Sequence, residues 1–338
     1  MSTPQSNELP VGPPFVSTGD LPEPLWIRQL LEEAHQRFKG DQQGINAQVY
    51  PALARVPSDL FGICIVGTSG AVYPKGDVDH LFSIMSVSKP FVFALVSEKL
   101  GADVVRRQVG VNATGLPFNS LTAIEKSSDG RTNPMVNSGA IAATSLAPGE
   151  NLEEKWAFIY EGLCRFAGRE LTMNEEVYRS AMTTNHRNQS IARLLQTFGR
   201  VYVDPAEAIE LYTRQCSLNV TAKDLAVMGA TLADGGINPI TKDRVVRPMI
   251  CHYALAVMTI AGMYETSGDW LFDIGLPGKS GISGGIVAVS PGKGALGTFA
   301  PPLDSAGNSV KGQLAAKFLS QNLGMDLFVS RPEVAQPE

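Results

Sequence analysis

The first candidate for covalent chemistry in the chain is the segment Ser86-Val87-Ser88-Lys89. On a helix, residues three positions apart lie on the same face, so the Lys89 amine can accept the hydroxyl proton of Ser86. A lysine does this only when neutral, and burial among the apolar residues that follow would lower its pKa from about 10.4. Pro90 is tolerated only near a helix start, which places Ser86 at the entrance. Taken alone, this spacing fits an ordinary helix start better than a catalytic pair.

A second element lies near the other end of the chain, where Gly278-Lys279-Ser280-Gly281 precedes Gly284-Gly285 and an apolar run. Serine β-lactamases and penicillin-binding proteins combine a Ser-x-x-Lys with a late Lys-Thr-Gly on a strand that lines the cleft. A glycine-rich hairpin turn is the plainer interpretation. A phosphate-binding loop is excluded, because it requires a glycine where Asp273 stands and a strand before a helix.

Other catalytic and metal-binding patterns are missing from the sequence. The four histidines, at 35, 80, 186 and 252, have no metal-ligand spacing, and the four cysteines form no Cys-x-x-Cys pair. There is neither a Gly-x-Ser-x-Gly elbow nor a dinucleotide fingerprint. We therefore expect no metal and no cofactor. In a chain this long the cysteines, at 64, 164, 216 and 251, are expected to be reduced thiols, which favours a cytoplasmic protein.

The composition is that of a globular chain. Its 338 residues are 44% hydrophobic and 18% charged, and the net charge of −5 argues against a nucleic-acid partner. Residues 1–20 are polar and proline-rich without a signal-peptide pattern, so they are expected to form a disordered arm, and 331–338 a tail. The longest apolar run, 249–264, is too short to span a membrane.

The elements that must hold these residues follow from hydrophobic periodicity. A helix is expected over 22–40, a hairpin from 60–66 and 71–73, and a strand over 80–84. Residues 86–264 are predicted to be almost wholly helical, with helices near 89–100, 151–167, 187–198, 205–216, 222–233 and 246–262. Thr221 and Asp224 resemble a capping box at one of these starts.

After Gly275 the pattern returns to strands, at 284–290 and 296–300, before a last helix over 310–323. The two distant groups of strands predict an α/β (α+β) fold within 21–330. In it, one sheet is assembled from about 59–84 and 283–300, and the helical stretch of about 86–264 is inserted as a lobe. The site is expected in a cleft between the sheet and the lobe.

Over nearly its whole length the chain resembles the serine-dependent glutaminases, relatives of the β-lactamases. The matching stretches are 57–62 (PSDLFG), 133–141 (NPMVNSGAI), His186-Arg187-Asn188, Tyr212 with Gln215-Cys216-Ser217, 233–236 (ADGG), Gly262-Met263-Tyr264, 275–281 (GLPGKSG), 301–304 (PPLD) and 307–310 (GNSV). Each stretch alone would be taken for a turn, a cap or a core contact. So many in the same order identify the family.

The resemblance implies a β-lactamase-like fold, with an antiparallel sheet flanked by helices and a helical lobe, and a homo-oligomer, either dimer or tetramer. It also implies deamidation of glutamine to glutamate and ammonia through an acyl-enzyme on Ser86, which Lys89 activates. By similarity, Tyr212 and Tyr264 relay protons, and the backbone N–H groups of Ser86 and Ile282 form the oxyanion hole. Asn137 and Asn188 hold the α-carboxylate, and Lys279, Ser280 and Gly281 line the substrate cleft. Without the resemblance, each tyrosine would be taken for a half-buried core ring.

Three positions depart from the family pattern. Val49 stands where the family has tyrosine, Met85 replaces the glutamine before the nucleophile, and Ala181 replaces a glutamate that faces the substrate's α-ammonium. A buried ammonium without a carboxylate partner is strongly penalised. The sequence therefore leaves open a second substrate class, amides, lactams or acyl compounds without a free α-ammonium. It also leaves open a non-catalytic binding protein on this fold, although retention of the Ser-Lys-Tyr residues favours an enzyme.

Overall fold

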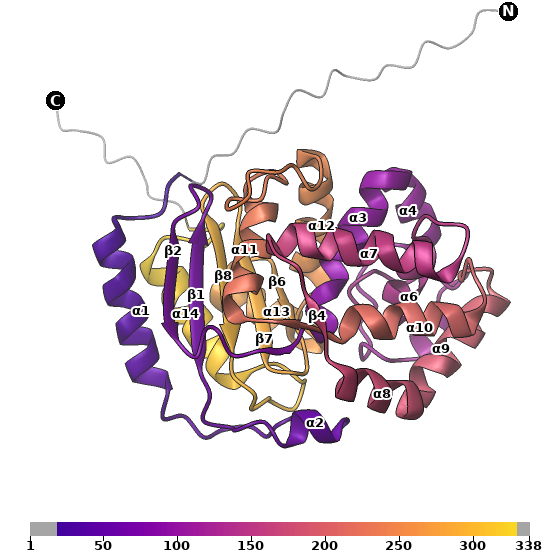
Figure 1. Cartoon of the computed structure of the whole chain (residues 1–338), viewed down its shortest axis with the longest axis horizontal. Helices are drawn as coiled ribbons and strands as arrows, with labels where there is room; N and C mark the ends of the chain where they lie inside the picture. Colours follow the sequence, from indigo (N-terminus) through magenta and orange to yellow (C-terminus); the bar gives the residue numbers. More distant parts are fainter. Residues whose placement is uncertain (1–18, 330–338) are drawn as a thin grey trace, which may run out of the picture.

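The computed structural model describes residues 19–329, and its centre is a five-stranded antiparallel sheet in the order β2-β1-β8-β7-β6 (Figure 1). The strands are β1 (Gly62–Gly67), β2 (Val72–Gly76), β6 (Gly278–Ser280), β7 (Gly285–Ser290) and β8 (Gly294–Phe299). β1 pairs with β8, so that Val66 lies opposite Ala295. Strands from both ends of the chain therefore form one sheet, as the sequence predicts.

The two faces of this sheet pack into two separate cores. Because successive strand residues point to opposite faces, Ile63 and Ile65 join one core and Cys64 and Val66 the other. The first core is closed by α1 (Pro24–Phe38) and α14 (Val310–Asn322), and the second by α11 (Ala222–Ala233). The sheet lies between these helices in Figure 1.

Glycines allow α11 to lie directly on the sheet. A Cβ atom on Gly297 of β8 would stand 2.2 Å from the carbonyl oxygen of Ala222 and 2.6 Å from the backbone nitrogen of Ala226. A Cβ on Gly229 would stand 2.6 Å from Ala295 Cβ. α11 itself begins with a complete capping box formed by Thr221 and Asp224. This helix falls inside the range predicted for the separate lobe, but it forms a layer of the sheet.

Most of the other helices gather on one side of the sheet (Figure 1). They are α3 (Ser88–Leu100), α4 (Ala102–Val109), α5 (Thr122–Glu125), α6 (Asn137–Ser145), α7 (Leu152–Ala167), α8 (Glu175–Thr184), α9 (His186–Thr197), α10 (Pro205–Cys216) and α12 (Pro248–Ala261). α13 (Ser267–Ile274) packs against α14 and joins the core on that face of the sheet, and α2 (Pro51–Ala54) packs against α8. Short 3₁₀ turns at Met85–Val87 and Tyr264–Thr266 precede α3 and α13. No described helix is both long and apolar enough to cross a membrane.

A second, small sheet joins the two regions in the order β3-β5-β4. Its strands are β3 (Phe82–Ser83), β5 (Leu218–Val220) and β4 (Thr172–Met173). The strand predicted at 80–84 therefore pairs with β5 and not with the central sheet, which corrects the expectation. Because β3 leads directly into the turn at Met85–Val87, its pairing with β5 fixes the segment that carries Ser86.

The predicted arm and tail fall mostly outside the described residues. Residues 1–18 and 330–338 are not described, so the expectations of a disordered arm over 1–20 and a tail over 331–338 stay predictions.

Candidate active site

Ser86 lies in the 3₁₀ turn that leads into α3, where its side chain is buried at a small pocket. The residue before it, Met85, has φ of +48°, a left-handed conformation that is rare for a residue with a side chain. Such strain is typical of sites where the surrounding structure holds a functional group in one position. The turn at Met85 thus places Ser86 ahead of the first turn of α3, as Pro90 predicts.

Lys89 is fully buried in the first turn of α3. Its Nζ donates hydrogen bonds to the carbonyl oxygen of Met135 at 3.3 Å and to Asn137 Oδ1 at 2.7 Å. Burial lowers the pKa of Lys89 to about 7, and the neighbouring Cys216 thiol only partly opposes this. A substantial fraction of Lys89 is therefore neutral near pH 7 and able to accept a proton.

Asn137 connects the residues around Lys89. Its Oδ1 accepts from Lys89 Nζ and, at 3.2 Å, from the Tyr212 hydroxyl, while its Nδ2 donates to Asn188 Oδ1 at 2.9 Å. α6, α9 and α10 thereby each supply one member of a single network. Burial raises the pKa of Tyr212, so this phenol stays protonated and keeps its hydrogen bond to Asn137.

Tyr264 approaches Ser86 from the 3₁₀ turn before α13. It has φ of +55°, a second strained backbone position at the site. Its hydroxyl donates to the carbonyl oxygen of Ser280 at 3.1 Å. Burial raises the pKa of Tyr264, and a side-chain hydrogen bond with Ser86 acts in the opposite direction. A protonated phenol is therefore held in contact with the serine hydroxyl.

Lys279, Ser280 and Gly281 lie behind the pocket, although the sequence predicts them in its lining. Lys279 Nζ is fully buried and donates to the carbonyl oxygens of Gly262 at 2.9 Å and Ser280 at 2.7 Å. It stands 4.3 Å from the centre of the Tyr264 ring. Burial, assisted by the charge of Lys89, lowers its pKa. The pocket lining begins one residue later, at Ile282, so the expectation for these three residues is corrected.

The pocket above Ser86 has a volume of about 70 Å³. The pocket is lined by Asn137, Asn188, Tyr212, Met85, Ala181 and Ile282, and also by residues to which the sequence analysis assigned no role: Tyr50, Phe118, Val177, Asn185, Thr213, Cys216 and Ser217. Among residues 19–329, the backbone N–H groups of Ser86 and Ile282 find no acceptor in the protein. Two free donors beside a serine hydroxyl match the requirement of an oxyanion hole.

One wall of the pocket is apolar. Met85, Val177 and Ala181 contact one another in a small cluster with Tyr50. Val49 is 62% exposed and absent from the lining, whereas Tyr50, the next residue, is 8% exposed and lies against Met85. The expectation that Val49 occupies the site is therefore corrected by one position, and the pocket does contain a tyrosine on this side.

Tyr50 and Cys216 could have been found from the sequence. Tyr50 is adjacent to the position that the family pattern marks, and Cys216 lies inside the stretch 215–217 that matches the family. The other residues have no spacing signal, because they come from the loop before α5, from α8, from the junction between α8 and α9, and from the end of α10 and the residue after it. No group of three or more His, Cys, Asp or Glu side chains in the described part of the chain could hold a metal ion.

An antiparallel sheet covered by helices, with a buried Ser-x-x-Lys pair beside free backbone donors, defines a serine hydrolase of β-lactamase-like architecture. Residues 44–328 match the family described as Glutaminase. The chain is 69% identical over 318 residues to "Glutaminase 2" of Yersinia pestis, which covers 94% of each protein. It is 48% identical over 309 residues to "Glutaminase" of Brucella canis, which covers 91% of this chain and 98% of that one.

The solved structures that resemble this fold are also glutaminases. A probable glutaminase, ybaS, superposes with a TM-score of 0.90 at 42% identity, over 91% of this chain and all of that one. A probable glutaminase from Bacillus subtilis, complexed with 6-diazo-5-oxo-L-norleucine, gives a TM-score of 0.77 at 31% identity, over 90% and 94%. The chain belongs to the glutaminase family, whose members hydrolyse L-glutamine to L-glutamate and ammonia, and it is an enzyme of this kind.

Proposed function

We propose that this glutaminase works through an acyl-enzyme on Ser86, with Lys89 as the base. The Ser86 oxygen attacks the carboxamide carbon, and its proton passes to the neutral Lys89 amine. The observation that carries this proposal is the set of contacts around Lys89. A neutral amine has two N–H donors and one lone pair, and both donors are engaged, by Met135 and Asn137. The lone pair is then free to accept the serine proton.

Tyr264 is the group best placed to return a proton to the leaving nitrogen. Its raised pKa keeps the phenol protonated, and its hydrogen bond with Ser86 puts it beside the reacting carbon. As the C–N bond breaks, ammonia departs with the proton that Tyr264 gives, and Lys89 resupplies Tyr264. Tyr212 belongs to the same proton-transfer network, because its hydroxyl and Lys89 Nζ both donate to Asn137 Oδ1.

The second half of the reaction uses the same groups in reverse. Water attacks the acyl carbon and Lys89 accepts its proton. The Ser86 oxygen then leaves and takes that proton back from Lys89. In both halves the N–H groups of Ser86 and Ile282 stabilise the negative carbonyl oxygen. The free carboxylate that forms is the glutamate side chain.

A Ser86→Ala variant tests this mechanism. We expect ammonia release from L-glutamine to fall by about 10⁴-fold or more, because nucleophile and base act as a unit. A Ser69→Ala variant, which alters an exposed turn hydroxyl, serves as the matched control and should keep full activity. A fluorophosphonate probe should label the wild type and not Ser86→Ala. Turnover that survives in Ser86→Ala would overturn the assignment.

A second candidate function concerns the substrate. No charged side chain in the described residues lines the pocket, and Met85 and Ala181 make one wall apolar. A free amino acid brings an α-ammonium that such a wall cannot pair. An amide whose α-nitrogen is blocked, such as N-acetyl-L-glutamine, has no ammonium and avoids the free-energy cost of leaving that charge unpaired.

The ratio of kcat/KM for N-acetyl-L-glutamine to that for L-glutamine tests this second candidate. In the wild type we expect the acetylated amide to equal or exceed L-glutamine. Ala181→Glu should shift the ratio toward L-glutamine by about 10-fold or more, and the uncharged Ala181→Gln should not, since only a carboxylate pairs the ammonium. A wild-type preference for L-glutamine by orders of magnitude would contradict this reading.

We also propose that the chain forms a homo-oligomer, dimer or tetramer, in the cytoplasm. Phe272 on α13 is 93% exposed, and Tyr253 and Ile260 on α12 add exposed apolar surface, which supports self-association. All four cysteines are free thiols, which supports a reducing compartment.

A further inference from the structure

Three buried side chains form a line of hydrogen bonds that ends on the peptide group between Met85 and Ser86. The Thr144 hydroxyl donates to Gln215 Oε1 at 2.8 Å, and Gln215 Nε2 donates to Ser88 Oγ at 3.3 Å. The Ser88 hydroxyl in turn donates to the carbonyl oxygen of Met85 at 2.8 Å. All three side chains are fully buried. We call Thr144, Gln215 and Ser88 the buried polar network.

The direction of these hydrogen bonds is set by the chemistry of the donors. An amide N–H can only donate, so Ser88 Oγ accepts from Gln215 and its own proton is left for the Met85 carbonyl. Cys216 Sγ lies farther from Ser88 Oγ, at 4.0 Å. A serine hydroxyl often bonds to a carbonyl three or four residues before it, but Gln215 is not a local partner, because it comes from the end of α10. A distant element therefore holds the Ser88 hydroxyl in one orientation.

The segment that carries Gln215 also anchors the turn of residues 84–88 on its other side. The backbone N–H of Ile84 donates to the carbonyl oxygen of Leu218 at 2.8 Å. Residues 215–218 therefore contact this turn both before Met85 and after Ser86. Attachment at both ends accounts for the strained φ of +48° at Met85, which would relax without support from its surroundings.

A fixed Met85 carbonyl also orients the backbone N–H of Ser86. The two groups belong to one planar trans peptide, in which the C=O and N–H bonds point in opposite directions. That N–H is one of the two oxyanion-hole donors in the mechanism proposed above. Hydrogen bonds to the carbonyl polarise the peptide, so its N–H becomes a stronger donor.

We propose that Ser88 and Gln215 are positioning residues for the oxyanion hole and act through the peptide between Met85 and Ser86. This inference deepens the proposed function and rests on it. Neither Ser88 nor Gln215 lines the pocket, so neither contacts the substrate. Their effect is confined to the step in which the substrate's carbonyl oxygen becomes negative, because the oxyanion hole binds that oxygen most strongly in the transition state. The effect should therefore appear in kcat and not in KM.

Steady-state kinetics with L-glutamine test the proposal. Ser88→Ala should lower kcat by about 10-fold, less than the loss of a whole oxyanion donor, and leave KM within about twofold of the wild type. Gln215→Met, whose side chain has a similar length and no N–H donor, should lower kcat by about 3-fold to 10-fold. The apparent pKa of kcat/KM should stay at its wild-type value in both variants, because Lys89 keeps its own hydrogen-bond partners.

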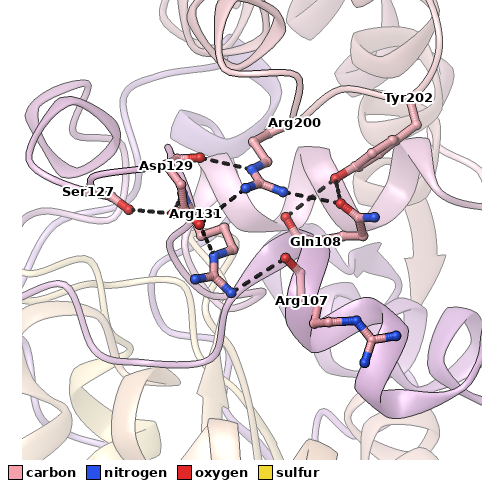
Figure 2. A network of polar contacts seen from close by, with 7 residues as sticks. All are labelled: Arg107, Gln108, Ser127, Asp129, Arg131, Arg200 and Tyr202. Carbon is pink, nitrogen blue, oxygen red and sulfur yellow. Dashed lines mark hydrogen bonds and ion pairs between the residues drawn. The ribbon is translucent and has the colours of Figure 1, made fainter.

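A double variant and a matched control isolate the effect. If Gln215 acts through Ser88, the variant carrying both Ser88→Ala and Gln215→Met should have the kcat of Ser88→Ala alone. The control is Tyr202→Phe, which removes a hydroxyl that donates to Gln108 Oε1 at 2.6 Å in the separate polar network of Figure 2. None of the seven residues drawn there belongs to the buried polar network. Tyr202→Phe should lower the urea midpoint and keep kcat within about twofold of the wild type.

Several results would overturn the positioning role. They are a folded Ser88→Ala variant with the wild-type kcat, a KM that rises as much as kcat falls, a shifted apparent pKa, losses that multiply in the double variant, or an equal loss in Tyr202→Phe. If Ser88→Ala does not fold, Gln215→Met decides the question, and an unchanged kcat overturns the proposal. Turnover that survives in Ser86→Ala would instead reject the underlying mechanism, whereas an inactive Ser86→Ala beside a fully active Ser88→Ala rejects the positioning role alone.

Discussion

At the scale of single residues, the protonation of Lys89 sets the pH dependence of this enzyme. The groups that face its amine are the carbonyl of Met135, the amide of Asn137, the phenol of Tyr212 and the thiol of Cys216, none of them a carboxylate. Burial therefore dominates and lowers the pKa of Lys89 to about 7. The second buried amine, Lys279, has its pKa lowered as well, by burial first and by the charge of Lys89 second.

This environment predicts a rise of kcat/KM with pH. Below pH 7 Lys89 is protonated and cannot accept the serine proton, so kcat/KM should fall by about tenfold for each pH unit. Above pH 7 the profile should level off. The measurement is kcat/KM for L-glutamine between pH 5 and about 9. The Lys89→Arg variant carries a side chain that stays charged, so it should lose activity at every pH. A wild-type kcat/KM that stays constant from pH 5 to about 7 would refute the role of Lys89 as the base.

At this scale the sequence predicts the position of a residue along the chain better than the direction of its side chain. Helical spacing places Ser86 and Lys89 on one short segment, the 3₁₀ turn and the first turn of α3. Val49 was misplaced because residues 39–50 contain no helix and no strand that would fix their register. Lys279 was misplaced because side chains alternate along a strand, and the residues of β6 carry no pattern that reveals which face meets the pocket.

At the scale of elements, periodic segments were predicted and uniformly buried ones were not. The helices predicted at 205–216 and 222–233 match α10 and α11 in their bounds, because cap residues and apolar stripes mark them. α6 was not singled out, since all nine of its residues, Asn137–Ser145, are buried and it has no polar face to create a period. The pairing of β3 with β5 depends on tertiary contacts that no local pattern encodes.

The contact of α11 with β8 yields a prediction for Gly297. A Cβ atom there would meet the backbone of Ala222 and Ala226, which cannot rotate away. Gly297→Ala should therefore lower the free energy of unfolding by about 1–3 kcal/mol or more. The matched control is Gly268→Ala in α13, where the new Cβ would meet nothing within 4 Å, and a gain of about 0.5–1 kcal/mol is expected. Urea unfolding measures both, and equal stability of the two variants would contradict the packing argument.

At the scale of the whole molecule, two buried lysines link stability to pH. The folded pKa values of Lys89 and Lys279 are lower than in the unfolded chain, so the unfolded chain binds more protons above pH 7. The free energy of unfolding should therefore rise with pH, on the order of 1 kcal/mol per unit. The rise should weaken above about pH 8.5, where thiols ionise in the unfolded chain while burial raises the pKa of Cys64 and Cys251 to about 12 in the folded one.

Urea unfolding at a series of pH values from about 7 to 8.5 checks this dependence. Lys279→Met should flatten the curve, because it removes one of the two titrating amines, whereas the exposed Lys223→Met should leave the slope unchanged. If the free energy of unfolding of the wild type falls over this interval, groups other than the two lysines control how stability depends on pH.

The pairing of β1 with β8 also determines when the enzyme can become active during its synthesis. The ribosome makes Ser86, Lys89 and Tyr212 before the strands β6, β7 and β8 and the backbone donor of Ile282. Until then the apolar strand β1 lacks its neighbour on one side and is open to association with other nascent chains. An incomplete chain lacks the Ile282 backbone donor and three strands of the central sheet, so we expect it to have no glutaminase activity.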